Sequence, residues 1–155
     1  MNPADLLDSS RILLGIDGRL PKEEVIRRLV AAAMQGCNGS TQRIVAELLE
    51  REKKMTTGIG RGVAIPHARS ERVQEPLAAL GVSPAGINYA SLDDEPVRII
   101  FMFITPEGTP SLHIRTLAHA VAIFGNVEVR KAIVAAPDPD AVLDIIRKTP
   151  VDPEG

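Results

Sequence analysis

The sequence has little of what marks disulfide-stabilised, base-stacking or membrane-spanning proteins. Cys37 is the single cysteine, which excludes an internal disulfide and fits a reducing compartment. Aromatic residues make up 3% of the chain and tryptophan is absent, which argues against a stacking surface for single-stranded nucleic acid. No apolar run approaches the roughly 20 residues that cross a bilayer, and the N-terminal MNPADLLDSS lacks a signal-peptide pattern. We therefore expect a cytoplasmic protein with no nucleic acid partner and no direct membrane insertion.

Charge is nearly balanced over the whole chain but not locally. Eighteen basic and twenty acidic side chains give a net charge of −2, which indicates no general attraction to nucleic acid or membrane surfaces. Between Arg43 and Arg72, however, seven basic side chains stand against four acidic ones. A site for an anion is therefore more readily placed in this segment than elsewhere.

The length of 155 residues fits one ordinary domain, and no internal repeat or long linker divides the chain. We assign residues 1–150 to a single domain and residues 151–155 to a disordered tail. The run 97–105 is apolar on both faces, as expected of a central strand covered by helices on each side, so we predict an α/β fold with a mixed sheet. The other predicted strands are 11–16, 63–65 and 77–82, with a turn at 83–86 and a further short strand at 87–90, and the predicted helices are 21–36, 40–53, 111–125, 127–135 and 140–148.

The segment TGIGRGVAIPHAR, residues 57–69, has glycine at every second position before an apolar run that ends in Pro66-His67. A dinucleotide fingerprint would require glycine at Val63 and a following helix, and a P-loop would require Gly-Lys-Ser/Thr, so neither nucleotide motif is present. The pattern alone is equally typical of a flexible loop.

His67 follows a rigid proline at the end of a predicted strand, where α/β proteins commonly place functional groups. The preceding glycines offer backbone N–H groups, and Arg61 and Arg69 add positive charge, which suits a side chain that accepts or holds a phosphoryl group. The alternative is a strand-end histidine in solvent.

His113 falls in the first turn of a predicted helix, within a stripe that comprises Leu117, Ala120, Val121 and Phe124 and is flanked by Ile114. A histidine at this place feels the positive end of the helix dipole, which favours a neutral ring and a nearby anion. The equally weighted alternative is a core histidine bonded to a backbone carbonyl. His119 is predicted to lie on the opposite, exposed face.

Other standard sites have little support. His113 and His119 do not share a helical face, Asp93-Asp94-Glu95 before a proline is typical of a solvated loop, and no Gly-x-Ser-x-Gly motif is present. We therefore expect neither a metal nor a cofactor.

The stretch LLEREKKMTTGIGRGVAIPHAR, residues 48–69, resembles the active-site segment of enzyme IIA domains of the mannitol/fructose type in the bacterial phosphotransferase system, including the nitrogen-regulatory branch. VRIIFMFITPEG and SLHIRTLAHAVAIF follow in the expected order. The resemblance implies a three-layer α/β/α sandwich around a mixed, mainly four- to five-stranded sheet. It also implies a phosphotransferase that needs no nucleotide or metal at this step.

The resemblance further implies that His67 is the phosphorylated nucleophile, that His113 stabilises the phosphoryl group and that Arg51 stabilises its charge. The phosphoryl group would come from the phosphohistidine of the histidine-containing phosphocarrier protein and pass to a IIB domain or act as a signal to a regulatory target. With these residues, the glycine run becomes a candidate phosphoryl-binding loop whose backbone groups would face the phosphoryl. That loop comprises Thr57, Gly58, Ile59, Gly60, Arg61 and Gly62.

Three functions remain open. Because 155 residues hold one IIA-like domain, we expect a freestanding, nitrogen-type regulatory carrier. The alternatives are the IIA component of a fructose- or mannitol-type uptake system and, in another class, a binding module that is never phosphorylated. Arg61 stands where many members of the family carry Asn, which leaves its role open between catalysis and partner choice. The sequence gives no oligomeric state.

Overall fold

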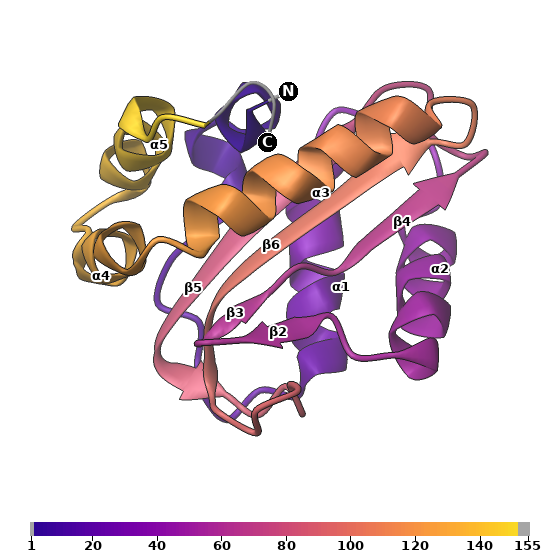
Figure 1. Cartoon of the computed structure of the whole chain (residues 1–155). Coiled ribbons are helices and arrows are strands. Elements are labelled where there is room, and N and C mark those ends of the chain that lie inside the picture. The colour runs from indigo at the N-terminus through magenta and orange to yellow at the C-terminus, as the bar shows by residue number, and fades with distance from the viewer. Residues whose placement is uncertain (1, 152–155) are drawn as a thin grey trace.

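The computed structural model describes residues 2–151 and arranges them in three layers (Figure 1). Helices α1 (Lys22–Ala33) and α2 (Thr41–Lys54) cover one face of the sheet. Helices α3 (Pro110–Phe124), α4 (Val127–Ala135) and α5 (Pro139–Lys148) cover the other. The short 3-10 helices η1 (Pro3–Leu6) and η2 (Ser9–Arg11) precede the first strand. The predicted α/β/α arrangement is thereby confirmed.

The sheet of the described residues is mixed and has the strand order β1-β5-β6-β3-β2, with β4 also paired to β6. β6 runs antiparallel to β5 and parallel to β3 and β4, while β1 is parallel to β5 and β2 antiparallel to β3. The strands are β1 (Ile12–Leu13), β2 (Gly58–Gly60), β3 (Val63–Ala64), β4 (His67–Ser70), β5 (Leu77–Ile87) and β6 (Val97–Pro106).

The central strand β6 holds the two cores together. Phe101 and Phe103 belong to the cluster under α3–α5, whereas Ile100 and Met102 belong to the cluster under α1 and α2. Alternate side chains of a strand point to opposite faces, so a strand between two helical layers must be apolar on both. The prediction of a doubly covered strand at 97–105 is therefore confirmed.

His67 does not stand at the end of a strand, as the sequence predicted, but begins one. β3 and β4 follow each other along the same side of β6, and Pro66, which has no N–H to donate, separates them. The carbonyl of Pro66 still accepts a hydrogen bond from the amide of Phe103, at 3.1 Å. The ladder is therefore interrupted without a change of register, since Val63 lies opposite Ile99 and His67 lies opposite Phe103.

The predicted turn at 83–86 and the separate strand at 87–90 are wrong, because β5 continues to Ile87. The register against β6 shifts within this stretch, so the turn-forming residues produce an irregularity of the strand instead of a reversal. The hydroxyl of Ser83 donates to the carbonyl of Ile16 at 2.7 Å, which ties the irregular part to the segment after β1.

The predicted apolar stripe of α3 is confirmed at Ala120 and Phe124, but the buried face is rotated away from Val121 and Ile114. Ile114 is 67% exposed and Val121 is 43% exposed, although both were expected to face the core. The buried face consists of Thr116, Ala120, Ile123 and Phe124. His113 lies one turn before Thr116 on this face, so α3 directs the histidine toward the sheet.

The predicted disordered tail, residues 151–155, lies only partly within the described residues. Residues 152–155 of the predicted disordered tail lie outside the described residues. Val151, the first residue of that predicted tail, is half-buried and packs against the cluster under α5.

Candidate functional site

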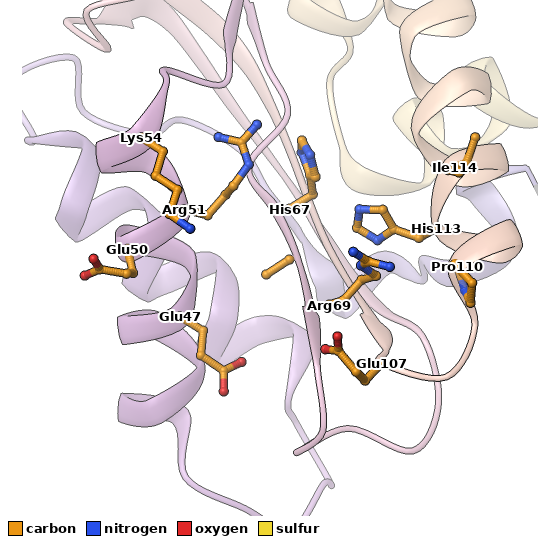
Figure 2. Close-up of a pocket in the computed structure, with 11 residues that line it drawn as sticks. Glu47, Glu50, Arg51, Lys54, His67, Arg69, Glu107, Pro110, His113 and Ile114 are labelled. Carbon is orange, nitrogen blue, oxygen red and sulfur yellow. The ribbon is translucent and has the colours of Figure 1, made fainter.

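A cavity of about 560 Å³ opens between α2, β4 and the start of α3 (Figure 2). Figure 2 shows His67 between Arg51, which reaches the cavity from the last turn of α2, and His113 at the start of α3. Cations and carboxylates are both present around these residues. The lining residues are Glu47, Glu50, Arg51, Lys54, His67, Ala68, Arg69, Glu107, Pro110, His113 and Ile114.

The ring of His67 is fixed by one hydrogen bond and one stacking contact. Its Nδ1 lies 2.6 Å from the carbonyl oxygen of Ile65, and the ring stacks on Phe103 with centroids 5.4 Å apart and an interplanar angle of 12°. Because a carbonyl oxygen can only accept, Nδ1 carries the proton and donates it. The other ring nitrogen, Nε2, therefore keeps its lone pair and is the atom available for chemistry.

His113 is held by a hydroxyl from the central strand. Its Nδ1 lies 2.7 Å from Oγ1 of Thr105, a fully buried residue of β6, and its ring centroid is 5.3 Å from that of His67. Either member of the Thr105–His113 pair can donate. When the threonine donates, Nε2 of His113 carries a proton that it can donate in turn.

Both histidines are shifted toward the neutral form. Burial lowers the pKa of His67, and the positive charge of Arg51 lowers it further, against the opposing effects of the Ile65 carbonyl and Glu52. Burial, followed by repulsion from His67, Arg69 and Arg51, lowers the pKa of His113 to about 4. Near pH 7 both rings are therefore uncharged, and a neutral imidazole is a nucleophile whereas an imidazolium is not.

Arg51 places a cation next to the two rings. It is half-buried, its Nη1 donates to the carbonyl of Met55 at 2.9 Å, and Figure 2 shows its guanidinium extending to the side of His67. A guanidinium has five N–H donors, so the bond to Met55 leaves others for an anion in the cavity. Figure 2 also shows the guanidinium of Arg69 beside His113.

Glu52, the neighbour of Arg51, anchors the end of α2. Its side chain is 3% exposed, accepts from the ammonium of Lys22 at 3.2 Å and accepts from the amide of Thr57 at 2.9 Å. The hydroxyl of Thr57 donates to the same carboxylate at 2.5 Å and lies 2.9 Å from that of Tyr89. Burial, followed by the nearby Glu52 charge, raises the pKa of Tyr89, so its hydroxyl stays protonated. This network ties α1, α2 and the chain that leads to β2 to one another.

The predicted phosphoryl-binding loop lies elsewhere. None of residues 57–62 is among the described residues that line the cavity; Gly58–Gly60 form β2, and Arg61 and Gly62 connect it to β3. Several of the backbone N–H groups in the predicted loop already donate to side chains near this hairpin, so they do not face His67. The amide of Thr57 donates to Glu52, that of Gly58 to Thr56 Oγ1 and that of Arg61 to Asp93.

The acidic triplet serves the same hairpin. Asp93 accepts from the amide of Arg61 at 2.9 Å and from that of Glu95 at 3.1 Å, and these bonds lower its pKa.

Within residues 2–151, no group of three or more His, Cys, Asp or Glu side chains is arranged to hold a metal ion. His119, predicted to be exposed, is half-buried on α3. Over the same described range, no helix is both long and apolar enough to span a membrane.

Two residues of the arrangement were missed in the sequence. Thr105 carries a signal that could have identified it, since it is the one hydroxyl in the apolar run 97–105 and stands just before the loop to His113. Glu52 could have been suspected only from its position beside Arg51, because a glutamate in the sequence EREKK is typical of a solvent-exposed helix face.

Comparisons with known proteins cover nearly the whole chain. It is 35% identical over 149 residues to the PTS system fructose-specific EIIABC component of Bacillus subtilis, a match that covers 96% of this chain but only 23% of that protein. It is 32% identical over 143 residues to a nitrogen regulatory protein of Pseudomonas aeruginosa, covering 91% of this chain and 92% of that one.

The fold has a close counterpart among solved structures. The crystal structure of the nitrogen regulatory protein IIA-Ntr from Neisseria meningitidis matches with a TM-score of 0.86 over 92% of this chain and 97% of that chain, at 24% identity. The family described as "Phosphoenolpyruvate-dependent sugar phosphotransferase system, EIIA 2" matches residues 5–149. The chain therefore belongs to the EIIA 2 family of the phosphoenolpyruvate-dependent sugar phosphotransferase system.

Proposed function

We propose that Nε2 of His67 accepts a phosphoryl group from the phosphohistidine of the histidine-containing phosphocarrier protein and later releases it to a second protein. The observation that carries this proposal is the orientation of the ring. The carbonyl of Ile65 holds the proton on Nδ1, and Nε2 is thereby left with a free lone pair beside a cavity that also contains His113 and Arg51.

The transfer balances without an added acid or base. The lone pair of His67 Nε2 forms a new N–P bond as the N–P bond of the donor breaks, and that electron pair returns to the donor imidazole. The ring of His67 keeps its Nδ1 proton and acquires positive charge, which the carbonyl of Ile65 stabilises at 2.6 Å. Bonds of similar energy are exchanged, so the protein has mainly to orient the groups and stabilise the phosphoryl oxygens.

His113 and Arg51 are the proposed donors to those oxygens. In this role Thr105 would donate its hydroxyl proton to Nδ1 of His113, a direction that the 2.7 Å contact allows, and Nε2 would carry a proton to donate to the phosphoryl group. Arg51 supplies N–H groups and a full positive charge from the opposite side of His67. A donor that is well placed for the transition state contributes on the order of 3 kcal/mol.

The charged rim suits a protein partner. Three cations, Arg51, Lys54 and Arg69, line the cavity together with the carboxylates of Glu47, Glu50 and Glu107. A mixture of signs favours a complementary protein surface over a polyanion. We propose the phosphocarrier protein as donor and either a IIB domain or a regulatory target as acceptor. The single domain at residues 1–150 and the cytoplasmic location stay predictions from the sequence.

A nitrogen-type regulatory role is the favoured reading of the downstream step. The name of the Pseudomonas aeruginosa relative, nitrogen regulatory protein, supports this role. The alternative, a IIA component of fructose or mannitol uptake, is supported by the name of the Bacillus subtilis component. A binding module that is never phosphorylated remains the candidate of another class.

A labelling experiment tests the carrier mechanism. The protein is incubated with labelled phosphoenolpyruvate, enzyme I and the phosphocarrier protein, and we expect a label that is labile in acid and stable in base. His67→Ala should remove the label, His113→Ala should slow its appearance, and His119→Ala serves as the control because His119 does not line the cavity. An unlabelled wild-type protein, or a labelled His67→Ala variant, would refute the carrier role and favour the binding module.

A second experiment separates regulation from uptake. The purified phosphoprotein is mixed with a fructose-type or a mannitol-type IIB domain, and the label on each chain is followed in time. Rapid transfer to either IIB domain supports the uptake role. Retention of the label supports the regulatory role.

A further inference from the structure

A second cavity, of about 340 Å³, lies where the β2–β3 hairpin, the start of β6 and α4 meet. Half of its lining residues are cations and none is acidic. We propose that this cavity binds a small molecule that carries a phosphate group on an apolar or planar body, as a nucleotide does. The lining residues are Arg61, Gly62, Arg98, Ile99, Arg130, Lys131, Val134 and Ala135.

The cavity is separate from the one at His67. Ile99 pairs with Val63, and Phe103 pairs with His67, so the two places are four residues apart along β6, about 13 Å. Figure 1 shows the β2–β3 hairpin and the tip of β4 at opposite ends of the sheet. Binding at this cavity does not require phosphorylation of His67.

The four cations of this cavity are not engaged in close ion pairs within the part of the chain that the structure describes. Among residues 2–151, Arg61, Arg98, Arg130 and Lys131 form no ion pair with a carboxylate, whereas Arg19, Arg27, Arg28 and Arg72 each do. Like charges gathered around one concave surface repel one another, so their proximity is favourable mainly when an anion lies between them.

Two of the guanidinium groups are held in place by backbone carbonyls. Arg98 donates through Nε to the carbonyl of Pro84 at 3.2 Å, and Arg130 donates through Nη1 to the carbonyl of Gly125 at 2.6 Å, at the end of α3. Each bond uses one nitrogen and leaves further N–H groups to donate. Because these two side chains are already ordered, they would lose less conformational entropy when an anion binds.

Arg61 occupies a turn position that arginine does not favour. Its φ is 60° and that of Gly62 is 81°, so both residues of the two-residue hairpin connection are left-handed. Such a turn favours Asn or Gly at the first position, and a long side chain there is strained. A residue kept in an unfavourable conformation points to a use for its side chain, and here that side chain lines the cationic cavity.

An apolar cavity of about 270 Å³ adjoins the cationic one and shares Arg61 and Arg130 with it. Ile59 and Val121 line it and are 41% and 43% exposed. The two cavities together have the size of a small-molecule site, which is concave and combines apolar walls with a few polar groups. A phosphate at the guanidinium groups would place an attached ring or apolar body against this surface.

The test is a titration of the full chain, with ADP as the probe and with inorganic phosphate, adenosine and a polyglutamate peptide as comparisons. We expect saturable ADP binding by calorimetry, with amide shifts at Arg61 and Ile99 in NMR spectra, and much weaker binding of phosphate or adenosine alone. Lys131→Gln and Arg98→Gln should weaken ADP binding at least tenfold. Arg147→Gln, which removes a cation from α5, and His67→Ala should bind as the wild type does.

Three outcomes would overturn the inference. These are absence of saturable ADP binding, equal binding by the wild type and both cavity variants, and loss of binding in His67→Ala. Binding of polyglutamate without ADP would replace the small molecule with an acidic protein segment. Lys131 makes no hydrogen bond or ion pair with another described side chain, so its variant tests the site even if Arg98→Gln were to disturb the fold. Labelling of His67 in the same variants keeps the two proposals distinguishable.

Discussion

Replacing Thr105 with valine should separate the orientation of His113 from the presence of its ring. Valine has nearly the same shape and suits the buried strand β6, but it removes the hydroxyl that lies 2.7 Å from His113 Nδ1. A neutral hydrogen bond contributes about 1 kcal/mol to stability, and His113 is only half-buried, so water can replace part of the loss. We expect the free energy of unfolding to fall by about 1 kcal/mol.

The effect on phosphoryl transfer should be larger than that loss of stability suggests. Without Thr105, the ring of His113 is free to rotate and to carry its proton on either nitrogen, so only part of the population can donate to the phosphoryl group. A loss of about 1.4 kcal/mol of transition-state stabilisation corresponds to a tenfold slower transfer. The assay is rapid-quench, single-turnover transfer from the phosphorylated phosphocarrier protein.

The matched control is Thr116→Val. Thr116 is also fully buried, and its hydroxyl donates to the carbonyl of Leu112 at 2.8 Å, so this change removes a hydrogen bond of similar worth within α3. It should reduce stability comparably and leave the transfer rate unchanged, while Thr105→Ser should restore most of the rate. Equal transfer rates for Thr105→Val and Thr116→Val would refute the proposed role of the hydroxyl.

Three further expectations concern stability. Glu52→Gln should lower the free energy of unfolding in urea by about 2 kcal/mol, because it leaves the ammonium of Lys22 without its buried partner; an unchanged midpoint would contradict the anchoring role. The pKa of His113 is lowered to about 4 in the folded chain, so between about pH 6.5 and pH 4 the unfolded chain binds the extra proton and stability should fall as the pH falls. His113→Gln should reduce this slope, and an identical slope would exclude His113 as its source. Arg61→Asn should raise the thermal midpoint by relieving about 0.5–1 kcal/mol of turn strain and should weaken ADP binding; a lower midpoint would show that the side chain stabilises the hairpin.

Local patterns were sufficient for most helices and for the central strand. Pro110 at the start of α3, Asn126 as the cap of α4 and the apolar spacing within each helix depend on neighbours in sequence. The same is true of the run 97–105, whose apolar character on both faces indicates a covered strand wherever it lies in the sheet. The fold class therefore followed from local signals.

Local patterns gave the wrong structure where the same residue types are compatible with two different conformations. Ser83 and Gly86 are residue types that favour a turn. Because β5 pairs with β6 on both sides of them, they form an irregularity within the strand instead. The glycine run suggested free backbone donors, but β3, Asp93 and Glu52 bind these groups and make a hairpin of the run. In both places the partners are remote in sequence.

The sequence by itself determined the residue types and the elements that carry them: a histidine after a proline, a histidine in the first turn of a helix and an arginine near the end of another. Only the tertiary structure decided that these three line one cavity, that the carbonyl of Ile65 fixes the proton on His67 and that Thr105 holds His113. It also decided that Arg61 lies in a separate cationic cavity. Periodicity gives the face of an element, whereas the distance between atoms on different elements is set by strand pairing and packing, which no local pattern encodes.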